Sequence, residues 1–382
     1  MSVTAQIKNV LKQFPFFAPR MVHSCKDWID RQKQKNGNYR AARQDWYKLL
    51  QPAEYYHHPA PHSIEPINKK GFDNNSSYRT NNAYLFNLKD AFLYRHKGII
   101  LSNYNECFQE FTHHFNIQTL KKFLLKNPFY TFAKQHTDIA ETSAVLISPE
   151  SHNYYHWVFD VLPRIKLYGD VMGQVDRFYV SSVVPQKFLD VLPQFGIPKE
   201  KLKLISDTEK LKFSNLFVAS LPGSEGRSPQ WAVDFIREKL LVGDQVSVPS
   251  KKIYFKRGNA SSRRILNEDA IIEILIADGF DIVDPENLAV TQQMEIVQNA
   301  QVIVSAHGAA LTNIVFAQKG NCSVVELLSP DYFRTDCYYT LACLLDLNYW
   351  YITGTKPAGA AWGDIVVPEE SLKETLARMK NG

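Results

Sequence analysis

Apolar and polar positions alternate in blocks through the second half of the chain. Short apolar runs predict β-strands at residues 252–257, 280–284, 301–306, 322–329 and 349–354. Segments with apolar residues at helical spacing predict helices at residues 267–279, 291–299, 307–317 (a turn that enters a helix), 336–345 and 368–379. Strand–helix alternation of this kind is typical of a parallel sheet whose two faces are covered by helices.

The first half is patterned less regularly. Residues 1–90 are rich in Tyr, His, Asn and Lys and predict only loops and short elements. Residues 84–101 predict a β-hairpin whose turn lies at residues 87–90. Further along, the pattern predicts strands at residues 143–148, 178–184, 202–206 and 216–220, with helices at residues 154–168, 185–195 and 229–241.

The 382 residues are enough for two domains. A polar, proline-containing segment at residues 242–251 separates the two halves and predicts an interdomain linker. We expect an N-terminal domain of residues 1–245, which includes the poorly patterned residues 1–90, and a C-terminal domain of residues 251–365. A last segment, residues 366–382, is expected to form a helix that crosses back to the N-terminal domain.

Composition narrows the class of protein. Hydrophobic residues make up 45% and charged residues 22%, which is typical of a globular chain and excludes a polytopic membrane protein. The net charge of +5 suits anionic ligands or a membrane surface but is too weak to indicate nucleic-acid binding. The five cysteines show no zinc-site spacing, and the first residues lack a signal peptide's apolar run. We therefore expect a cytoplasmic protein with reduced thiols.

The segment QVIVSAHGAALTNIVFA, residues 301–317, predicts a buried strand, a tight turn and a helix. Ligands of open α/β sheets bind beyond the carboxyl ends of the strands, and a helix N-terminus there favours phosphate. The small residues Gly308, Ala309 and Ala310 would let a diphosphate approach the backbone, and His307 could donate to a phosphate oxygen. The alternative is a turn whose small residues serve packing alone.

Two further features lie at the same expected edge of the sheet. The loop KRGNASSRRILNE, residues 256–268, holds four basic side chains within nine residues. Arginine forks match phosphate geometry, although a solvated basic loop would have the same composition. Glu326 lies near the end of an apolar strand, where a carboxylate can accept hydrogen bonds from ribose hydroxyls. Its alternative is a strand end that reaches solvent.

The segment SHNYYHWVFDVLPRI, residues 151–165, carries a third group of polar side chains. His152, His156 and Asp160 are spaced by four residues, so a helix would place them on one face. Three interpretations stay open at this point: a general base, a metal site, or polar residues satisfied at a domain interface.

Taken together, the segments NYYHWVFDVLPRI, RGNASSRRILNE, VSAHGAALTNIVFA and VVELLSP resemble glycosyltransferase family 61. The resemblance covers residues 145–350. That family includes bacterial proteins associated with capsular and cell-surface polysaccharide synthesis, plant xylosyltransferases and animal O-linked N-acetylglucosaminyltransferases. Ala310 stands where the family pattern often has Gly, and a methyl group is small enough for the site to be retained.

The resemblance implies an α/β fold of the GT-B type, in which two Rossmann-like domains with parallel sheets face each other across a cleft. It implies inversion at the anomeric carbon without a metal ion or other cofactor, and we expect a UDP-sugar as donor. Carried over by position, the nucleotide-sugar would be surrounded by Arg257, Asn259, Arg264, His307, Gly308, Ala309, Asn313 and Glu326. Asp160 and His156 would lie near the acceptor.

The expected reaction moves a hexosyl or pentosyl group to a hydroxyl of a glycan, or of a lipid-linked glycan, in capsular or cell-surface polysaccharide synthesis. Asp160 is the first choice for the general base, and His156 either replaces it or orients it. Arg257, Arg264 and His307 would stabilise the departing nucleoside diphosphate. A lipid-linked acceptor would bring the protein to the inner face of the membrane, where residues 7–17 could contact lipid.

Two alternatives remain beside this function. One is a nucleotide-sugar epimerase or hydrolase on the same fold, which would consume the donor without an acceptor. The other is a non-catalytic member that binds glycan or organises a biosynthetic complex. Nucleic-acid binding is not expected, because the arginine-rich loop lacks interleaved aromatic residues. The oligomeric state is left open.

Overall fold

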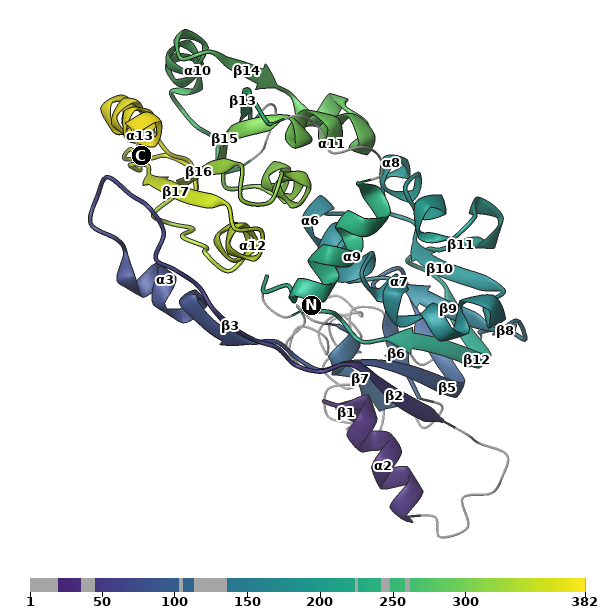
Figure 1. Ribbon diagram of the computed structural model, residues 1–382. Coiled ribbons are helices and arrows are strands. Elements are labelled where there is room, and N and C mark those ends of the chain that lie inside the picture. Colours follow the sequence, from purple (N-terminus) through teal and green to yellow (C-terminus); the bar gives the residue numbers. More distant parts are fainter. Residues whose placement is uncertain are drawn as a thin grey trace, which may run out of the picture. The chain divides into compact units, whose positions relative to one another are not determined.

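The computed structural model describes residues 20–35, 45–102, 106–112, 136–223, 226–241, 248–257 and 262–381 (Figure 1). The chain divides into two compact units. The first consists of Met1–Ala53 and Asn81–Ser224, and the second of Glu54–Thr80 and Glu225–Gly382. The segment Glu54–Thr80 therefore packs with residues that follow it by about 150 positions or more in the sequence.

The sheet of the second unit is parallel throughout and has the strand order β14-β13-β15-β16-β17. Its strands are β13 (Lys251–Phe255), β14 (Phe280–Val283), β15 (Ala300–Ala306), β16 (Ser323–Leu328) and β17 (Asn348–Thr353). These are the five strands that the apolar runs predict, so the parallel α/β prediction is confirmed for this unit. Such strands are apolar on both faces because helices cover both faces.

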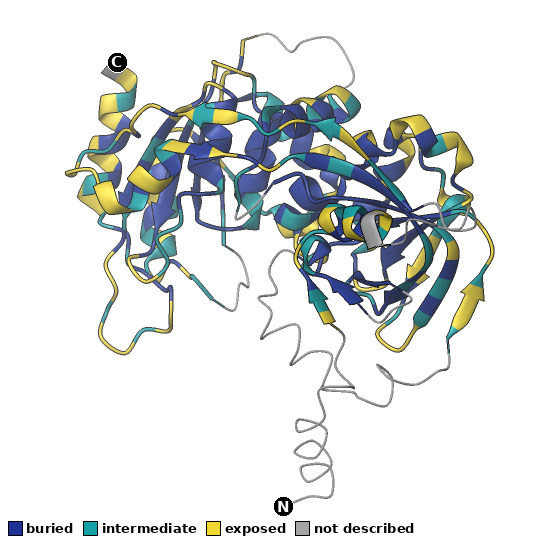
Figure 2. Cartoon of the chain, turned by 90° about the horizontal axis from the view of Figure 1, so that it is seen from below, coloured by how far each residue is buried: buried dark blue, intermediate teal, exposed yellow. Residues whose placement is uncertain are grey.

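Helices of the second unit lie on both sides of this sheet (Figure 1). α10 (Glu268–Ala277) and α13 (Glu369–Asn381) pack on one face, where Leu275 and Leu376 join a buried cluster with Val304 and Val325. Other described helices that follow residue 225 in this unit are α9 (Gln230–Leu240), η7 (Pro285–Asn287), α11 (Val290–Gln298), the 3-10 helix η8 (Ala309–Phe316) and α12 (Tyr338–Leu344). Figure 2 shows the strands largely in the buried colour and α13 with an exposed outer side.

The segment Glu54–Thr80 extends the second unit beyond its parallel sheet. It forms β3 (Tyr55–His57), α3 (Lys69–Ser76) and β4 (Ser77–Arg79). The backbone of His62 pairs with the edge strand β17, donating to Tyr349 O at 2.8 Å and accepting from Tyr351 N at 3.2 Å. Phe72 then packs against Tyr351 with ring centroids 4.8 Å apart. This segment covers an edge that would otherwise be open to pairing with another chain.

The first unit contains a ten-stranded mixed sheet. Its strands are β1 (Arg20–Val22), β2 (Trp46–Gln51), β5 (Ala83–Tyr94), β6 (Ile99–Leu101), β7 (Glu106–Phe108), β8 (Thr137–Ile139), β9 (Ser143–Leu146), β10 (Arg177–Ser181), β11 (Leu202–Ile205) and β12 (Lys210–Ala219). β9, β10 and β11 pair in parallel, and β12 is parallel to β9. β5 runs antiparallel to β12, β2 and β6. The prediction of a parallel sheet is therefore wrong for the part of this sheet around β5.

The hairpin prediction for residues 84–101 places the turn wrongly. β5 continues through residues 87–90, and the turn to β6 follows at residues 95–98. The polar side chains that suggested a turn form hydrogen bonds across the sheet, because Asn87 Nδ2 and Lys89 Nζ both donate to Asn215 Oδ1 on β12. Asp90 has a φ of 52°, and at this position the pairing of β5 with β12 is interrupted: Ala91 pairs with Phe213 and Lys89 with Asn215, but Asp90 and Ser214 do not pair.

The helical elements among the described residues of the first unit are α2 (Cys25–Lys35), η2 (Gln109–Phe111), α6 (Tyr154–His156), the π-helix η3 (Trp157–Val161), α7 (Arg164–Leu167), η4 (Gly169–Gln174), α8 (Gln186–Leu189), η5 (Leu192–Phe195) and η6 (Lys199–Lys201). The helix predicted at residues 185–195 is thus two short pieces. Pro193, at the start of η5, has no N–H with which to continue an α-helix.

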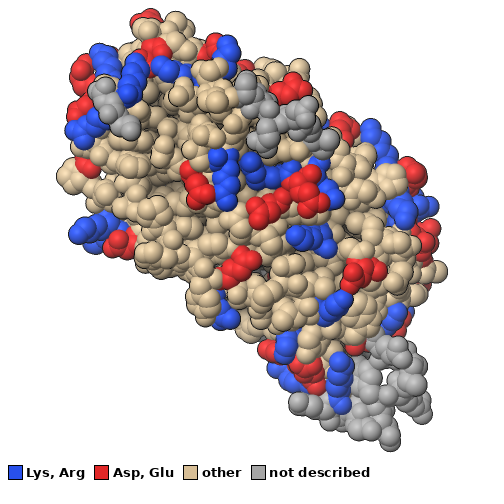
Figure 3. All heavy atoms as spheres, in the orientation of Figure 1, with Lys and Arg blue, Asp and Glu red and all other residues tan. Residues whose placement is uncertain are grey.

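All five cysteines are free thiols, and burial raises the pKa of Cys107 and of Cys322 to about 12. Within the described ranges, no helix is both long and apolar enough to cross a bilayer. Basic and acidic side chains lie interspersed on the face that Figure 3 shows.

Candidate functional site

The second unit has a topological switch point between β13 and β15. β13 is the first strand of its sheet in chain order, and its neighbours are the second strand, β14, and the third, β15. The chain therefore leaves the carboxyl ends of β13 and β15 in opposite directions. Ligands of doubly wound sheets bind at such a point. The basic loop follows β13, and the turn at residues 307–309 follows β15. Because β13 and β15 are parallel, the prediction that both lie at one edge of the sheet is confirmed.

Arg257 and Gly308 are in direct contact at this switch point. A Cβ atom on residue 308 would overlap with Nη1 of Arg257. The guanidinium is held by the backbone of its own loop, donating from Nη2 to Ser262 O at 2.8 Å and from Nε to Arg263 O at 3.2 Å. Burial lowers the pKa of Arg257, and the positive charge of Arg263 lowers it further. The missing side chain at Gly308 thus makes room for a partly buried cation.

His307 is anchored by Glu326 on the neighbouring strand β16. His307 Nδ1 lies 2.5 Å from Glu326 Oε1, and the other carboxyl oxygen accepts a hydrogen bond from Tyr349 Oη at 2.5 Å. Glu326 has no exposed surface. The imidazole ring lies between the rings of Tyr332 and Tyr338, each with its centroid 5.2 Å away. The carboxyl group therefore faces the imidazole and the phenol, and the ribose-binding role expected for it stays a prediction.

The two adjacent arginines of the basic loop have different surroundings. Arg264 forms an ion pair with Asp364, with Nη2 at 2.6 Å and Nε at 2.9 Å from Oδ2. Arg263 has a φ of 57° and places its guanidinium over the ring of Tyr332, 5.1 Å from the centroid. The role predicted for Arg264 at the diphosphate stays a prediction, and Arg263 was named in the sequence only as one of four basic side chains of the loop. A positive φ at a non-glycine residue is not visible in the hydrophobic pattern.

The other expected donor-site residues differ in accessibility. Ala309 is half-buried at the start of η8. Asn313 is fully buried inside η8, and its Nδ2 donates to Gln293 Oε1 at 2.7 Å and to Ala310 O at 3.0 Å. The bond to Gln293 joins η8 to α11, whereas the bond to Ala310 lies within η8. Asn259 lies outside the described residues.

In the first unit, the segment around His156 is a helix of three consecutive parts. Asn153 caps it, since its side chain accepts from Tyr155 N. α6 then passes into the π-helix η3, where Leu162 N donates to Trp157 O five residues back. Pro163 follows and leads into α7. π-helical turns are rare and are found frequently at functional sites.

His156 and Asp160 form a hydrogen-bonded pair on this helix. The distance from His156 Nδ1 to Asp160 Oδ2 is 2.8 Å, and Ser148 Oγ lies 3.4 Å from the same oxygen. The Asp160 side chain is 9% exposed and that of His156 is 20% exposed. His152 precedes the helix and pairs with Glu150 instead, so the expected face of three residues is wrong. Among the described residues, no group of three His, Cys, Asp or Glu side chains could hold a metal ion.

Arg164 is a buried cation beside this pair that sequence analysis missed. Only 1% of the residue is exposed. Its guanidinium bridges two strand ends, donating from Nη1 to Ile147 O and from Nη2 to Ala219 O, each at 2.7 Å. Burial lowers its pKa, while the charge of Asp160 acts in the opposite direction. In the sequence, the signal for this residue is a single arginine within a segment that predicts an apolar helix.

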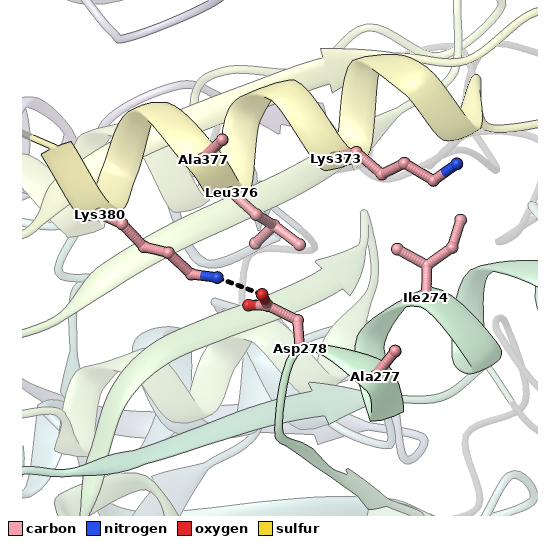
Figure 4. Close-up of a pocket in the computed structure, with 7 residues that line it drawn as sticks. All are labelled: Ile274, Ala277, Asp278, Lys373, Leu376, Ala377 and Lys380. Atoms are coloured by element: carbon pink, nitrogen blue, oxygen red, sulfur yellow. Dashed lines mark hydrogen bonds and ion pairs between the residues drawn. The ribbon is translucent and has the colours of Figure 1, made fainter.

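A cavity of the second unit lies away from the switch point. It has a volume of about 410 Å³ and lies between α10 and α13 (Figure 4). Its floor is apolar, with Ile274 and Leu376, and Lys380 pairs with Asp278 at one end. Because α10 runs antiparallel to the strands, its last turn marks the amino edge of the sheet, the edge opposite to the one that binds ligands.

Residues 154–325 match the family model described as Glycosyltransferase 61. The resemblance predicted from the sequence is thus confirmed over this segment. It includes His156, Asp160, Arg257 and His307, and it ends one residue before Glu326.

Several curated proteins are similar to part of the chain. The EGF domain-specific O-linked N-acetylglucosamine transferase of Drosophila melanogaster is 29% identical over 119 residues, which are 30% of this chain and 22% of that protein. Protein O-linked-mannose beta-1,4-N-acetylglucosaminyltransferase 2 is 32% identical over 125 residues in Canis lupus familiaris and 31% identical over 125 residues in Homo sapiens, in each case 30% of this chain and 21% of that protein. The chain spans about a fifth of the length of these relatives.

Proposed function

We propose that this protein is a glycosyltransferase that moves a sugar from a nucleotide-sugar, expected to be a UDP-sugar, to a hydroxyl of a glycan. The contact of Arg257 with the turn at Gly308 carries the proposal, because it puts a cation and a small-residue turn together at a switch point. The match to Glycosyltransferase 61 and the names of the relatives support the same class of reaction.

The diphosphate of the donor is proposed to bind beside Arg257, Arg263 and His307. Arg257 is partly desolvated, which strengthens its attraction for an anion. His307 Nδ1 is held by Glu326, so the other ring nitrogen has a set direction in which it can donate to a phosphate oxygen. We assign Glu326 the role of positioning His307, since both of its oxygens already meet protein donors.

The transfer is proposed to be a single displacement with inversion. The acceptor oxygen forms a bond to the anomeric carbon from the face opposite the diphosphate. The bond from that carbon to the diphosphate oxygen breaks, and its electron pair stays on the departing nucleoside diphosphate. The acceptor's proton passes to the His156–Asp160 pair. His156 is the more exposed member, so the geometry favours His156 as the base and Asp160 as the residue that orients it.

A GT-B arrangement of the two units is part of the proposal and rests on the family resemblance alone. The same is true of a role in capsular or cell-surface polysaccharide synthesis and of catalysis without a metal ion. The arginines and His307 would then supply the positive charge that a leaving diphosphate requires. A cytoplasmic location is also proposed, and it rests on the scattered cysteines and the pattern of the first residues.

The test is nucleotide binding by the full chain, compared between wild type and Gly308→Ala. Thermal stability would be measured with UDP, GDP, CMP, ADP and dTDP, each with and without EDTA. A ligand at 100 times its Kd adds about 2.7 kcal/mol to the free energy of unfolding, which is a readable shift. We expect one nucleotide to shift the melting temperature and Gly308→Ala to weaken that shift, because the new methyl group displaces Arg257.

Gly173→Ala is the matched control, since a Cβ there meets nothing within 4 Å. Gly308 has a φ of 175°, an extended backbone that alanine adopts without strain, so a loss of binding reports on the side chain alone. No shift with any nucleotide would overturn the donor site and favour a non-catalytic member. Binding followed by release of free sugar without any acceptor would favour a hydrolase, and conversion of the donor sugar to its epimer would favour an epimerase.

A further inference from the structure

A polar cavity of about 520 Å³ lies within the first unit. Four segments that are distant in the sequence contribute to it: the residues before α2, the start of β5, η2, and the residues that follow β12. Its polar walls include Asn81, Asn82, Tyr84, Gln109, Glu110 and Ser220. The volume is in the range of small-molecule sites.

The walls offer the groups that hydroxyls bind. Amide side chains supply donors and acceptors in one plane, and each sugar hydroxyl can both donate and accept. Gln109 lines the cavity with its amide group, whose Oε1 is buried and has no hydrogen-bond partner among the described residues. Asn82 Nδ2 donates to Tyr84 Oη at 3.1 Å, and Tyr84 N donates to Ser220 Oγ at 2.8 Å, which fixes the wall around the phenol.

The charge of the cavity selects against an anion. None of its lining residues is Lys or Arg. Its carboxyl group, Glu110, already occupies the N-terminus of α2, where Oε2 accepts a hydrogen bond from Cys25 N at 2.6 Å. A phosphate or a carboxylate at the N-terminus of α2 would therefore meet the carboxyl group of Glu110 there. A neutral ligand with several hydroxyls fits these groups better.

The cavity and the proposed base are linked through neighbouring strand ends of the same sheet. Ser220 directly follows β12, which lies parallel to β9, and Ser148 stands just beyond the end of β9. Arg164 joins the two strand ends through the carbonyls of Ile147 and Ala219, and Ser148 in turn contacts Asp160. Neighbouring strands lie about 4.8 Å apart. Ser220, which lines the cavity, and Ser148, which contacts Asp160, therefore follow adjacent strands at one edge of the sheet.

We propose that this cavity holds a neutral saccharide ring of the acceptor, next to the pair that takes the acceptor's proton. The assignment of the sugar to an acceptor rests on the proposed glycosyl transfer. The saccharide site itself does not, because it depends only on residues of the first unit.

The experiment is saturation-transfer NMR on the full chain with a panel of methyl glycosides of neutral hexoses, pentoses and N-acetylhexosamines. Two variants change the cavity wall: Gln109→Met replaces the amide group of one lining residue, and Asn81→Ala removes the exposed amide of another. We expect each to raise the Kd of a bound glycoside by about 3- to 10-fold, which corresponds to one hydrogen bond. Gln194→Met, on an exposed residue of the same unit, should leave the Kd unchanged.

UDP affinity, measured on the same samples, separates this proposal from the previous one. Glycoside binding that the cavity variants weaken, without UDP binding, would support the saccharide site and overturn the donor site. UDP binding together with no glycoside binding, or with glycoside binding that neither variant changes, would overturn the saccharide site alone. Both variants could also lower the melting temperature. The Kd of the glycoside is then compared between each variant and wild type at a temperature where all samples are folded, and that ratio decides the question.

Discussion

His307 Nδ1 lies 2.5 Å from Oε1 of Glu326, a carboxyl group with no exposed surface. The second oxygen of Glu326 accepts from Tyr349, and the proximity of that carboxylate adds to burial in raising the pKa of Tyr349. A hydrogen bond at one ring nitrogen of a histidine sets the direction of the other. His307 and Glu326 should therefore act as one functional group, which is a testable alternative to separate contacts with phosphate and ribose.

The first prediction is that their effects do not add. We expect His307→Ala and Glu326→Gln each to lower donor turnover by about 10- to 100-fold, the size of a lost charge-assisted hydrogen bond. The double variant should be no slower than His307→Ala, because Glu326 has nothing left to position. Steady-state kinetics on the three variants measures the coupling. If the two losses multiply, Glu326 acts independently of His307, as ribose binding would require.

The second prediction separates the two neighbouring arginines. Arg263 lies over Tyr332 and near Arg257, whereas Arg264 is held by Asp364. We expect Arg263→Ala to lower the affinity for the nucleotide by about 10-fold or more with little change in melting temperature. Arg264→Ala should lower the melting temperature, because the buried Asp364 loses its cation.

Calorimetry with the nucleotide and thermal unfolding of both variants provide the measurement, and Arg264→Lys is the control that keeps the charge. A loss of affinity confined to Arg264→Ala, with Arg263→Ala unchanged, would restore the original assignment from the sequence.

The parallel sheet of the second unit was predictable because its signal is local. Each of its strands is a short apolar run, and each run is followed by a turn and a segment of helical spacing. Buried parallel strands produce this pattern by necessity. The first unit lacks such a signal: the polar residues of β5 resemble a turn, and only their bonds to Asn215 on β12 explain them. The packing of Glu54–Thr80 on the second unit likewise depends on distant partners such as Tyr351.

The candidate site likewise has one part that the sequence predicts and another that depends on distant residues. Spacing of four residues correctly suggested that His156 and Asp160 meet, and the succession of strand, turn and helix correctly placed His307 at the edge of the sheet. The surroundings of Glu326 and Arg264 could not be inferred, since Tyr349 and Asp364 lie 23 and 100 residues away. Arg263 depends on a backbone conformation, a positive φ, that composition does not indicate.

The third prediction concerns the identity of the base. If His156 takes the proton, His156→Ala should lose turnover by about 100-fold or more while nucleotide affinity is kept. Added imidazole should restore part of that activity, because a small base can occupy the space of the missing ring. Formate added to Asp160→Ala should restore little, since Asp160 only orients the ring. The opposite pattern, rescue by formate and not by imidazole, would identify Asp160 as the base.

The fourth prediction concerns stability and pH. Burial raises the pKa of Glu110 from 4.5 to about 7, and Asp27 adds to the shift, while the bond from Cys25 N opposes it. Between these two values the unfolded chain has lost a proton that the folded chain keeps. The free energy of unfolding should therefore fall as the pH rises from about 4.5 to about 7, by at most about 3.5 kcal/mol at about 1.4 kcal/mol per unit of pKa.

Urea unfolding across this range, on wild type and on Glu110→Gln, gives the difference that belongs to Glu110. The glutamine variant keeps an acceptor for Cys25 N and has no charge to bury, so its stability should lack this slope and exceed that of wild type above pH 7. Glu200→Gln, on an exposed residue, is the control. Parallel curves for wild type and Glu110→Gln would show that the carboxyl group ionises at its ordinary pKa.

The fifth prediction rests on Arg164, where two large effects oppose each other. Burial of the guanidinium costs free energy, as its lowered pKa shows. Its hydrogen bonds to Ile147 O and Ala219 O, and the nearby charge of Asp160, act in the opposite direction. Removing one partner of a buried pair is costly because the other stays buried. Arg164→Lys, which cannot span both carbonyls, should lower the free energy of unfolding by about 1–3 kcal/mol.

Arg164→Met should lower the free energy of unfolding further, because it leaves both carbonyls without this donor and Asp160 without this cation. Lys203→Met, on an exposed residue of β11, should change it by less than about 0.5 kcal/mol in the same urea titration. Turnover adds a second measurement, because a shift of the strand ends moves Ser148 and, through it, Asp160. Arg164→Met could instead unfold at the same urea concentration as wild type and yet lose turnover. The free-energy cost of burying the guanidinium would then equal the stabilisation from its hydrogen bonds, and the role of Arg164 would be to position Asp160.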